Sequence, residues 1–397
     1  MNKRQAFPHN YGFNFDLEIN RIKSSSLKYD GRQGMFGNTD VIPLWVADMD
    51  FAAPLAVTKA LSERAIHPIY GYTIYPDSLY ESLAEWLEQH HGWHKIHRDW
   101  IVMCPGVVPS LHAAAMAFSE PGESIIVQPP VYFPFFSAVT STGRSLVLNP
   151  LKIENNRYTI DFDHLEKCAE KARILFLCSP HNPVGRVWDK TELENIIQIA
   201  KKYNLIIFSD EIHADLVFSE SKHQILAALD MDLGNIITAV APSKTFNIPG
   251  LNLSALIIPD ERNRALVMEA FELLHMSASN PFSIVAFEAA YREGKLWLSR
   301  LLAYLQETRD FVEQYLINYL PKIHLIKPEG TYLLWLDCRE LDMNDTQLKH
   351  FFINEASVGM SPGTLFGEGG EGFMRMNIGT PRHIIATALE NIRKVSK

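Results

Sequence analysis

Side chains able to do chemistry follow four apolar, β-rich runs of the sequence. These positions hold Gly106 within PGVVPS, Asn182 within SPHNPVG, Asp210 with Glu211 and His213, and Ser243 with Lys244. Ligands of open α/β sheets bind outside the carboxyl ends of the strands. We therefore expect these groups to meet at one edge of a sheet.

The four groups together supply an amine, an acid, an amide and a phosphate cradle. Gly106 leads into a predicted helix start, where free backbone N–H groups and the positive end of the helix dipole suit a phosphate. The Ser243 hydroxyl could add a donor. Pyridoxal phosphate requires such a set, because it uses a lysine Schiff base and a carboxylate partner for its pyridinium nitrogen.

The elements that must position these residues are seven short apolar runs: IVMC (101–104), SIIVQ (124–128), SLVLN (145–149), ILFLC (174–178), LIIFSD (205–210), IITAV (236–240) and LSALII (253–258). Runs that are apolar on both faces are typical of strands in a helix-covered, mainly parallel sheet. Amphipathic stretches lie between them. One, over residues 189–203, starts with acidic residues and ends in Lys201 and Lys202, which matches the helix dipole.

The pattern changes after about residue 285. A helix is predicted over 295–320, followed by strands at KIHLIK and YLLWLD, a helix, a last strand at MRMNI and a C-terminal helix. We predict an α/β fold in which a large domain (49–285) carries a mainly parallel seven-stranded sheet covered by helices. Residues 1–48 and 286–397 would form a smaller α+β domain, with the site in the cleft between the two.

Composition excludes several classes of protein. The 397 residues carry 37 Lys and Arg against 46 Asp and Glu, a net charge of −9, which argues against nucleic acid and anionic membranes as partners. No apolar stretch is long enough to span a bilayer, and no signal peptide is visible. The four cysteines form no CxxC pair and read as buried thiols, which favours the cytoplasm.

Eight motifs give the sequence a specific resemblance to a known family. They are VIPLWVADMDF (41–51), YGYT (70–73), PGVVPSL (105–111), PPVYFPF (129–135), SPHNPVG (179–185), SDEIHADL (209–216), APSKTFNIPGL (241–251) and FMRMNIG (373–379). In this order they resemble the fold-type I pyridoxal-phosphate-dependent aminotransferase superfamily, and within it the cystathionine β-lyase (C–S lyase) subgroup. The resemblance runs from about residue 10 to the end.

The resemblance implies catalytic roles for three residues. Lys244 would be the Schiff-base lysine and the base that removes the Cα proton, for which its pKa must fall. Asp210 would pair with the pyridine nitrogen. Tyr72 resembles a tyrosine that reaches the phosphate of a neighbouring subunit, which implies a homodimer with shared active sites.

The resemblance also implies the groups that bind cofactor and substrate. Asn182 would donate to the phenolic oxygen of the ring, and Tyr132 would stack on its face. The phosphate and the rest of the cofactor would contact Gly106, Val107, Val108, Ser243 and His213. Arg375 would clamp the substrate α-carboxylate as a bidentate fork, with Asn182 and Ala47 as further substrate contacts.

Two positions depart from the wider aminotransferase pattern. His213 replaces a common tyrosine, and Asn252 replaces a common phosphate-binding arginine. Both departures agree with the β-lyase subgroup, which would convert L-cystathionine or a related cysteine thioether to a thiol, pyruvate and ammonia. An aminotransferase using the same site is the nearest alternative, and a non-catalytic regulator that keeps the fold is the other.

Each residue also has an ordinary structural explanation. Lys244 could be a solvated turn lysine, Asn182 a turn residue, Tyr72 and Tyr132 core aromatics, and Arg375 a structural ion pair. No P-loop accompanies Asp210-Glu211, so a nucleotide hydrolase is excluded, and the GxGxxG at 367–372 leads into a strand rather than a helix. His90, His91, His94 and His97 are predicted to form a solvated helix end rather than a metal site.

Overall fold

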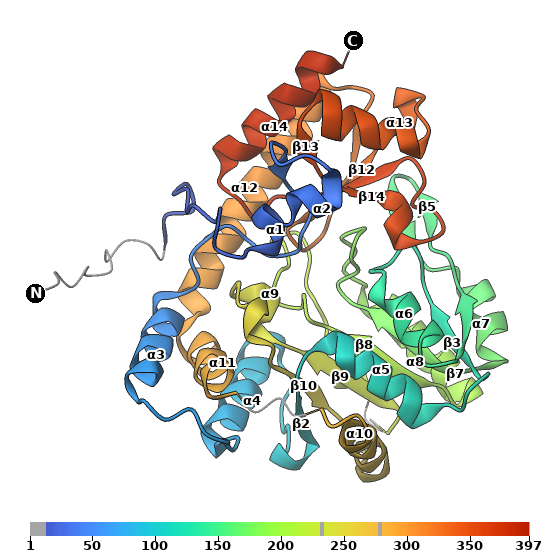
Figure 1. The fold of residues 1–397 in the computed structure, drawn as a ribbon. Helices are drawn as coiled ribbons and strands as arrows, with labels where there is room; N and C mark the ends of the chain where they lie inside the picture. The colour runs from blue at the N-terminus through green and yellow to red at the C-terminus, as the bar shows by residue number, and fades with distance from the viewer. Residues whose placement is uncertain (1–12, 231–233, 277–279, 397) are drawn as a thin grey trace, which may run out of the picture.

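A seven-stranded sheet forms the centre of the computed structural model, which describes residues 13–230, 234–276 and 280–396 (Figure 1). The strand order is β2-β10-β9-β8-β7-β3-β4, and only β10 runs antiparallel to its neighbours. The strands are β2 (Ile101–Cys104), β3 (Ser124–Val127), β4 (Ser145–Leu148), β7 (Ala172–Cys178), β8 (Ile206–Asp210), β9 (Ile236–Val240) and β10 (Ser254–Ile257). All seven coincide with the predicted runs, which confirms the predicted fold class.

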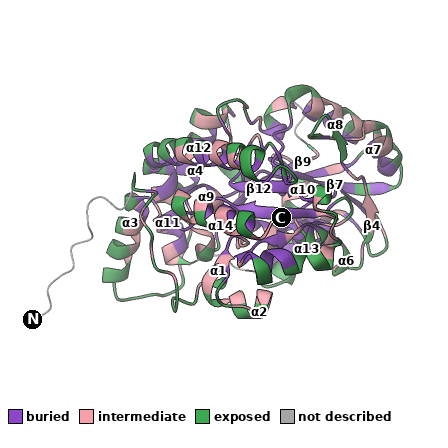
Figure 2. Ribbon diagram, turned by 90° about the horizontal axis from the view of Figure 1, so that it is seen from above, coloured by how far each residue is buried: buried purple, intermediate pink, exposed green. Residues whose placement is uncertain are grey.

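Helices cover both faces of this sheet because successive side chains of a strand point to opposite faces. On β7, Leu175 and Leu177 belong to the core cluster that contains α7 (Phe162–Ala169) and α8 (Lys190–Tyr203). Ile174 and Phe176 belong to the second cluster, with α5 (Val107–Phe118), α6 (Pro134–Thr140) and α10 (Glu261–Leu273). Figure 2 shows the sheet as a buried layer between helices with exposed outer faces.

Helix α8 illustrates how the sequence fixes these covering helices. Asp189 and Glu192 form a reciprocal capping box at its start, and Asn204 ends it in the left-handed conformation. Its inner face buries Leu193, Ile196 and Ala200. The predicted helix over 189–203 is confirmed.

A second, four-stranded antiparallel sheet lies in the C-terminal part, in the order β11-β12-β15-β14. Its strands are β11 (His324–Ile326), β12 (Leu333–Asp337), β14 (Ser361–Pro362) and β15 (Phe373–Asn377). The neighbouring helices are α12 (Lys295–Tyr319), α13 (Asp345–His350) and α14 (Arg382–Val395). The long helix, the last strand and the C-terminal helix all fall where the sequence predicts them.

The N-terminal segment packs beside this second sheet. Strand β1 (Ile42–Pro43) pairs in parallel with β13 (Val358–Gly359), and α1 (Leu27–Asp30) and α2 (Arg32–Phe36) precede it. Figure 1 shows these blue N-terminal elements below the red C-terminal helices. The division into domains at residues 49 and 285 stays a prediction.

The remaining elements flank the large sheet. They are α3 (Leu55–Ile66), α4 (Asp77–His91), α9 (Pro242–Thr245), α11 (Pro281–Glu293) and a short hairpin of β5 (Lys152–Glu154) and β6 (Arg157–Thr159). Within the described residues, no helix is both long and apolar enough to cross a membrane.

Candidate active site

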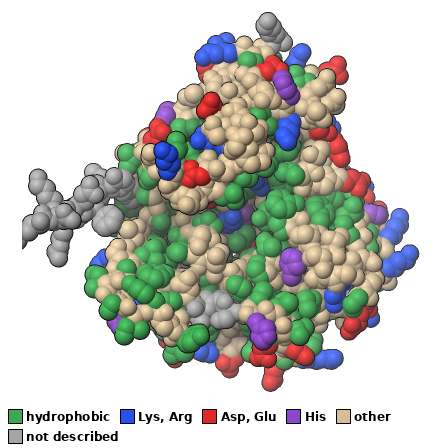
Figure 3. Space-filling model, viewed as in Figure 1, with side chains coloured by type: hydrophobic (Ala, Val, Ile, Leu, Met, Phe, Trp, Pro, Cys, Tyr) green, Lys and Arg blue, Asp and Glu red, His purple; other side chains and the backbone are tan. Residues whose placement is uncertain are grey.

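A cavity of about 300 Å³ opens at the carboxyl ends of β7, β8 and β9. It brings together almost all of the predicted site residues. Its lining includes Ala47, Gly106, Val107, Val108, Tyr132, Asn182, Asp210, His213, Ser243, Lys244 and Asn252. Figure 3 shows the hollow on this face of the molecule, with basic side chains inside it.

Lys244 projects into this cavity from α9, the single turn of helix that follows β9. Its Nζ donates a hydrogen bond of 2.8 Å to the carbonyl oxygen of Ala47. Burial, together with the positive charge of Arg375, lowers the pKa of this amine to about 8. Lys244 is therefore not a solvated turn lysine, and its neutral form is accessible near physiological pH.

Asp210 ends β8 and is almost completely buried. One carboxylate oxygen accepts the backbone N–H of Ile212 at 3.1 Å, and no Lys, Arg or His of the described residues forms an ion pair with it. Burial raises its pKa to about 7. A buried acid that faces a cavity without a cationic partner is suited to an N–H⁺ donor such as a protonated pyridine nitrogen.

Gly106 and the start of α5 line the cavity where the sequence predicts a phosphate cradle. Gly106 has φ 156° and ψ 161°, a conformation essentially confined to glycine. The chain turns here so that the first N–H groups of a twelve-residue helix face the cavity without intrahelical acceptors. Ser243 and Asn252 also line the cavity, so the donors available there are backbone dipoles and hydroxyl or amide groups.

Asn182 and Tyr132 are held together at the opposite wall. The backbone N–H of Tyr132 donates to the carbonyl oxygen of Asn182 at 3.0 Å, and the Asn182 side chain is buried. Its Oδ1 accepts a hydrogen bond of 3.0 Å from Arg375. Asn182 thus has a defined side-chain partner and is more than a turn residue.

Arg375 lies on β15 of the second sheet, between β12 and β14, and is buried. It donates to Asn182, to the carbonyl oxygen of Trp45 at 2.7 Å and weakly to Ser361 at 3.4 Å, while its Nε has no partner among residues 13–230, 234–276 and 280–396. No carboxylate of the described residues pairs with it, so it is not a structural ion pair. Burial lowers its pKa to about 10, and an incoming carboxylate would compensate this cost.

His213 occupies the position after β8 where a tyrosine would be common. It is buried, and its Nδ1 has no hydrogen-bond partner in the part of the chain that the structure describes. Burial, with Lys244 and Arg375 nearby, lowers the pKa of His213 to about 3. The ring is therefore neutral and has a free polar atom at the edge of the cavity.

Tyr72 and Arg375 are the predicted residues that do not line the cavity, and of the two only Arg375 has a hydrogen bond, among the described residues, to a lining residue, Asn182. The Tyr72 side chain is fully exposed, so it is not a core aromatic either. Ile66, Ile69, Tyr70 and Ile74 in the same segment are also exposed. An apolar segment of this kind on a single chain indicates a surface that another chain could cover.

Sequence reasoning missed several groups that hold the site. Tyr332 donates its hydroxyl to the carbonyl oxygen of Ala47 at 2.9 Å, beside Lys244. Trp45 and Ala47 act through backbone carbonyls, which any residue would supply. The signal in the sequence is the motif VIPLWVADMDF, in which Ala47 is the one predicted contact.

The prediction of a solvated helix end at the four histidines is wrong for His91. Its side chain is buried, and its Nε2 lies 2.7 Å from Asp215, which also accepts from Thr245 at 2.8 Å and from Trp86. The Asp215 carboxylate raises the pKa of His91 against the effect of burial. This pair supports the turn that carries Lys244. His94 is exposed and pairs with Glu88 as expected of a helix end.

The fold and this site are typical of pyridoxal-phosphate-dependent enzymes, and comparison with known proteins agrees with this class. The chain belongs to the aminotransferase class I and II family, whose model matches residues 39–392. Cystathionine beta-lyase PatB of Bacillus subtilis (strain 168) is 41% identical over 385 residues, covering 96% of this chain and 98% of the relative.

Two solved structures are closely similar in sequence and fold. Cystalysin from Treponema denticola, whose structure contains pyridoxal 5′-phosphate, is 34% identical with a TM-score of 0.93, covering 96% of this chain and 98% of that one. The pyridoxal-phosphate-bound C–S lyase from Staphylococcus hominis is 33% identical with a TM-score of 0.90, covering 97% and 99%. The resemblance inferred from the eight motifs is confirmed.

Proposed function

We propose that this protein is a pyridoxal-phosphate-dependent C–S β-lyase that acts on L-cystathionine or a related cysteine thioether. The observation that carries the proposal is that the Lys244 amine lines the cavity while the guanidinium of Arg375, which pairs with no carboxylate of the described residues, contacts Asn182 in the cavity wall. The Lys244 amine suits an aldehyde cofactor and can accept a proton from Cα. The Arg375 guanidinium suits the α-carboxylate of an amino acid. The similarity to PatB and to the S. hominis lyase favours elimination over amino transfer.

The residues present fit the cofactor. Lys244 would hold its aldehyde carbon, Asp210 its ring nitrogen, and the N-terminus of α5 with Ser243 its phosphate. Asn182 and Tyr132 would contact the ring, with His213 beside it. Pyridoxal phosphate, when bound, withdraws electrons from the Cα of an attached amino acid and so makes its proton acidic.

Arg375 would bind and orient the substrate. Its guanidinium offers a planar pair of donors to a carboxylate, and its contacts with Trp45 and Asn182 fix the plane of that fork. Ala47 would provide a backbone contact on the same side. Holding the carboxylate fixes the rotation about the Cα bonds, which determines whether the Cα proton faces Lys244.

Lys244 would then move the proton at Cα. With a pKa lowered to about 8, the free amine is available as a base near neutral pH. Loss of the Cα proton is followed by loss of the thiolate from Cβ. For L-cystathionine and one water, the products are homocysteine, pyruvate and ammonia.

The working form would be a homodimer. The exposed apolar segment with Ile66, Ile69 and Ile74 is suited to burial against a second copy, and Tyr72 within it would reach the partner's phosphate cradle. Four buried free cysteines favour a reducing compartment and therefore the cytoplasm.

An aminotransferase would use the same lysine and arginine, so turnover conditions must separate the two. A lyase turns over many times without a keto acid, whereas an aminotransferase stops after one turnover until a keto acid is added. The test measures L-cystathionine consumption by the cofactor-loaded protein with and without 2-oxoglutarate. Turnover that requires the keto acid would replace the lyase proposal.

A further inference from the structure

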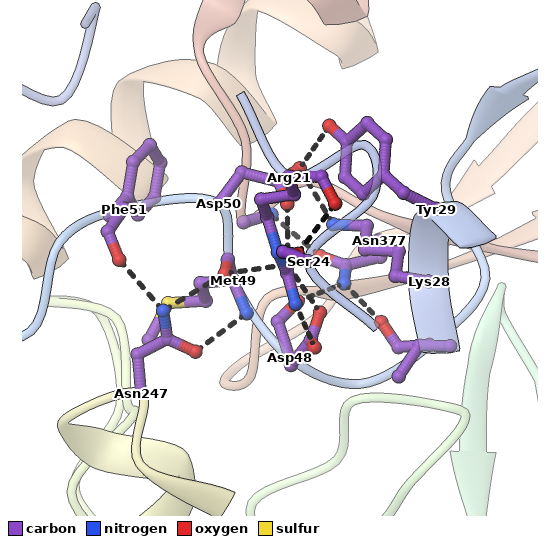
Figure 4. A network of polar contacts seen from close by, with 12 residues as sticks. Arg21, Ser24, Lys28, Tyr29, Asp48, Met49, Asp50, Phe51, Asn247 and Asn377 are labelled. Carbon is purple, nitrogen blue, oxygen red and sulfur yellow. Dashed lines mark hydrogen bonds and ion pairs between the residues drawn. The ribbon is translucent and has the colours of Figure 1, made fainter. Parts of the chain in front are cut away.

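The motif VIPLWVADMDF contains two aspartates for which the reaction has no use. We call residues 45–51 the acidic loop, because it carries Asp48 and Asp50. The loop follows β1 and passes between the second sheet and the turn that holds Lys244 (Figure 4). Its side chains do not enter the cavity lining except at Ala47.

Both cations of the site rest on carbonyl groups of this loop. Lys244 donates to the carbonyl of Ala47, and Arg375 donates to the carbonyl of Trp45, two residues earlier. Movement of the loop would therefore change the distance between the base and the carboxylate-binding group.

Two asparagines fasten the loop from opposite sides. Asn247, three residues after Lys244, contacts the backbone N–H and carbonyl of Met49 at 2.9 Å each and the carbonyl of Phe51 at 2.7 Å. Asn377, two residues after Arg375, donates to the carbonyls of Val46 and Asp48. The loop thus links the segment of Lys244 to the strand of Arg375.

The N-terminal segment also holds the acidic loop, through ion pairs with its two aspartates. Arg21 binds Asp48 with both terminal nitrogens, at 3.0 and 2.7 Å, and reaches Asp50 at 2.7 Å. Lys28 is 0% exposed and its Nζ lies 2.8 Å from the other oxygen of Asp50. The backbone carbonyl of Lys28 also accepts the indole N–H of Trp45 at 3.0 Å.

A buried lysine–aspartate pair is weak evidence for stability, because desolvation of both charges offsets their attraction. Such a pair does impose a geometry, since either charge left alone in that place is costly. In this protein the Lys28–Asp50 pair fixes the position of the acidic loop, whose carbonyls accept hydrogen bonds from Lys244 and Arg375.

We infer that Arg21, Lys28 and Asp50 are positioning residues, which lock the acidic loop and thereby set Lys244 and Arg375 at the spacing that one amino-acid substrate requires. This inference rests on the proposed function of the cavity. It assigns a role to the N-terminal segment and to both aspartates of the motif.

The test compares R21M and the double variant K28M/D50N with R309M as the matched control. The Arg309 side chain is 2% exposed, against 21% for Arg21, and it pairs with Glu220 and Asp310, none of which lines the cavity. The double variant removes the buried pair without leaving a lone charge. R21K, which keeps the charge but loses the fork, tests rescue.

Four quantities are measured on the cofactor-loaded proteins: the melting temperature, kcat and KM for L-cystathionine, and the dissociation constant of glycine, read from the cofactor absorbance. Glycine has the amino and carboxylate groups but no group to eliminate. We expect R21M and K28M/D50N to lower kcat/KM by about 10- to 100-fold and to weaken glycine binding, since small misplacements at a reacting centre carry costs of this size. R21K should recover part of the loss, and R309M should stay within about twofold of wild type.

Loss of stability without loss of kcat/KM or glycine affinity in R21M would overturn the inference. Arg21 is partly exposed at 21%, so R21M carries the test if the double variant does not fold. Absence of turnover in wild type, with normal binding of cofactor and glycine, would instead contradict the lyase proposal and leave the glycine comparison to decide the positioning role.

Discussion

Arg375 and Asn182 are joined by a hydrogen bond of 3.0 Å between Nη1 and Oδ1, across 193 residues of sequence. A guanidinium can only donate, so the amide oxygen of Asn182 must face it and the NH₂ group must point the other way. One side chain thus connects the predicted carboxylate-binding group with the side of the cavity that would hold the cofactor ring.

Replacing Asn182 by aspartate tests this connection. The new carboxylate would pair with Arg375 and compete with the substrate carboxylate, and it would lose the donor for the ring oxygen. We expect N182D to raise KM for L-cystathionine by about 10- to 100-fold, because charge-assisted bonds to a buried guanidinium are strong. Steady-state kinetics measure this, and an unchanged KM would show that Arg375 does not bind the substrate.

Replacing Arg375 by lysine keeps the charge and removes the fork. An ammonium cannot contact Asn182, Trp45 and a bidentate carboxylate together. R375K should therefore raise KM about 100-fold while the cofactor absorbance and the melting temperature stay near wild type. A variant that loses the cofactor instead would place Arg375 among the groups that hold it.

Asp210 gives a pH-dependent prediction for the cofactor-free protein. Burial raises its folded-state pKa to about 7, above the unfolded value of 3.8. Below pH 4 the carboxyl of Asp210 is neutral in both states, and its contribution to the free energy of unfolding is fully present. As the pH rises to about 7, ionisation is easier in the unfolded state than in the folded one, and this contribution is lost. Lys244 is protonated in both states through most of this range, so it does not cancel the effect.

The amide of D210N resembles the protonated acid and cannot ionise, so this variant does not lose stability as the pH rises. Without cofactor, D210N should match wild type near pH 4 and exceed its unfolding free energy at pH 7.5 by on the order of 2–4 kcal/mol. With cofactor the order should reverse, because the ring nitrogen loses its partner. Urea unfolding at both pH values measures the first effect, and a difference that does not change with pH would contradict the shifted pKa.

Tyr72 tests the shared site. If it reaches the partner's phosphate, Y72F should remain a dimer in sedimentation equilibrium and bind pyridoxal phosphate about tenfold more weakly, as expected for one lost hydrogen bond to a charged group. A fully active monomer in wild type would exclude the shared site.

The sequence was sufficient to predict the main architecture and most of the cavity. The seven central strands are apolar on both faces, and the helix around residues 190–203 carries explicit capping signals, so local physics identifies them. The site residues could be predicted because they follow strand ends that a parallel sheet must bring to one edge.

What could not be predicted depends on long-range contacts or on the backbone. Strands β1, β13 and β14 have two residues each, too few to show a period of two. The burial of His91 depends on Asp215, 124 residues away. The acidic loop acts through carbonyls of Trp45 and Ala47, which have no signature in side-chain chemistry.

The most direct test of the central claim is the product balance of wild type and K244A with L-cystathionine as the only substrate. We predict many turnovers by wild type, with equal amounts of pyruvate, ammonia and homocysteine, and a loss of at least about 10³-fold in K244A, since the base and the attachment point are removed together. Unimpaired turnover in K244A, or consumption of a single equivalent without pyruvate in wild type, would contradict the account.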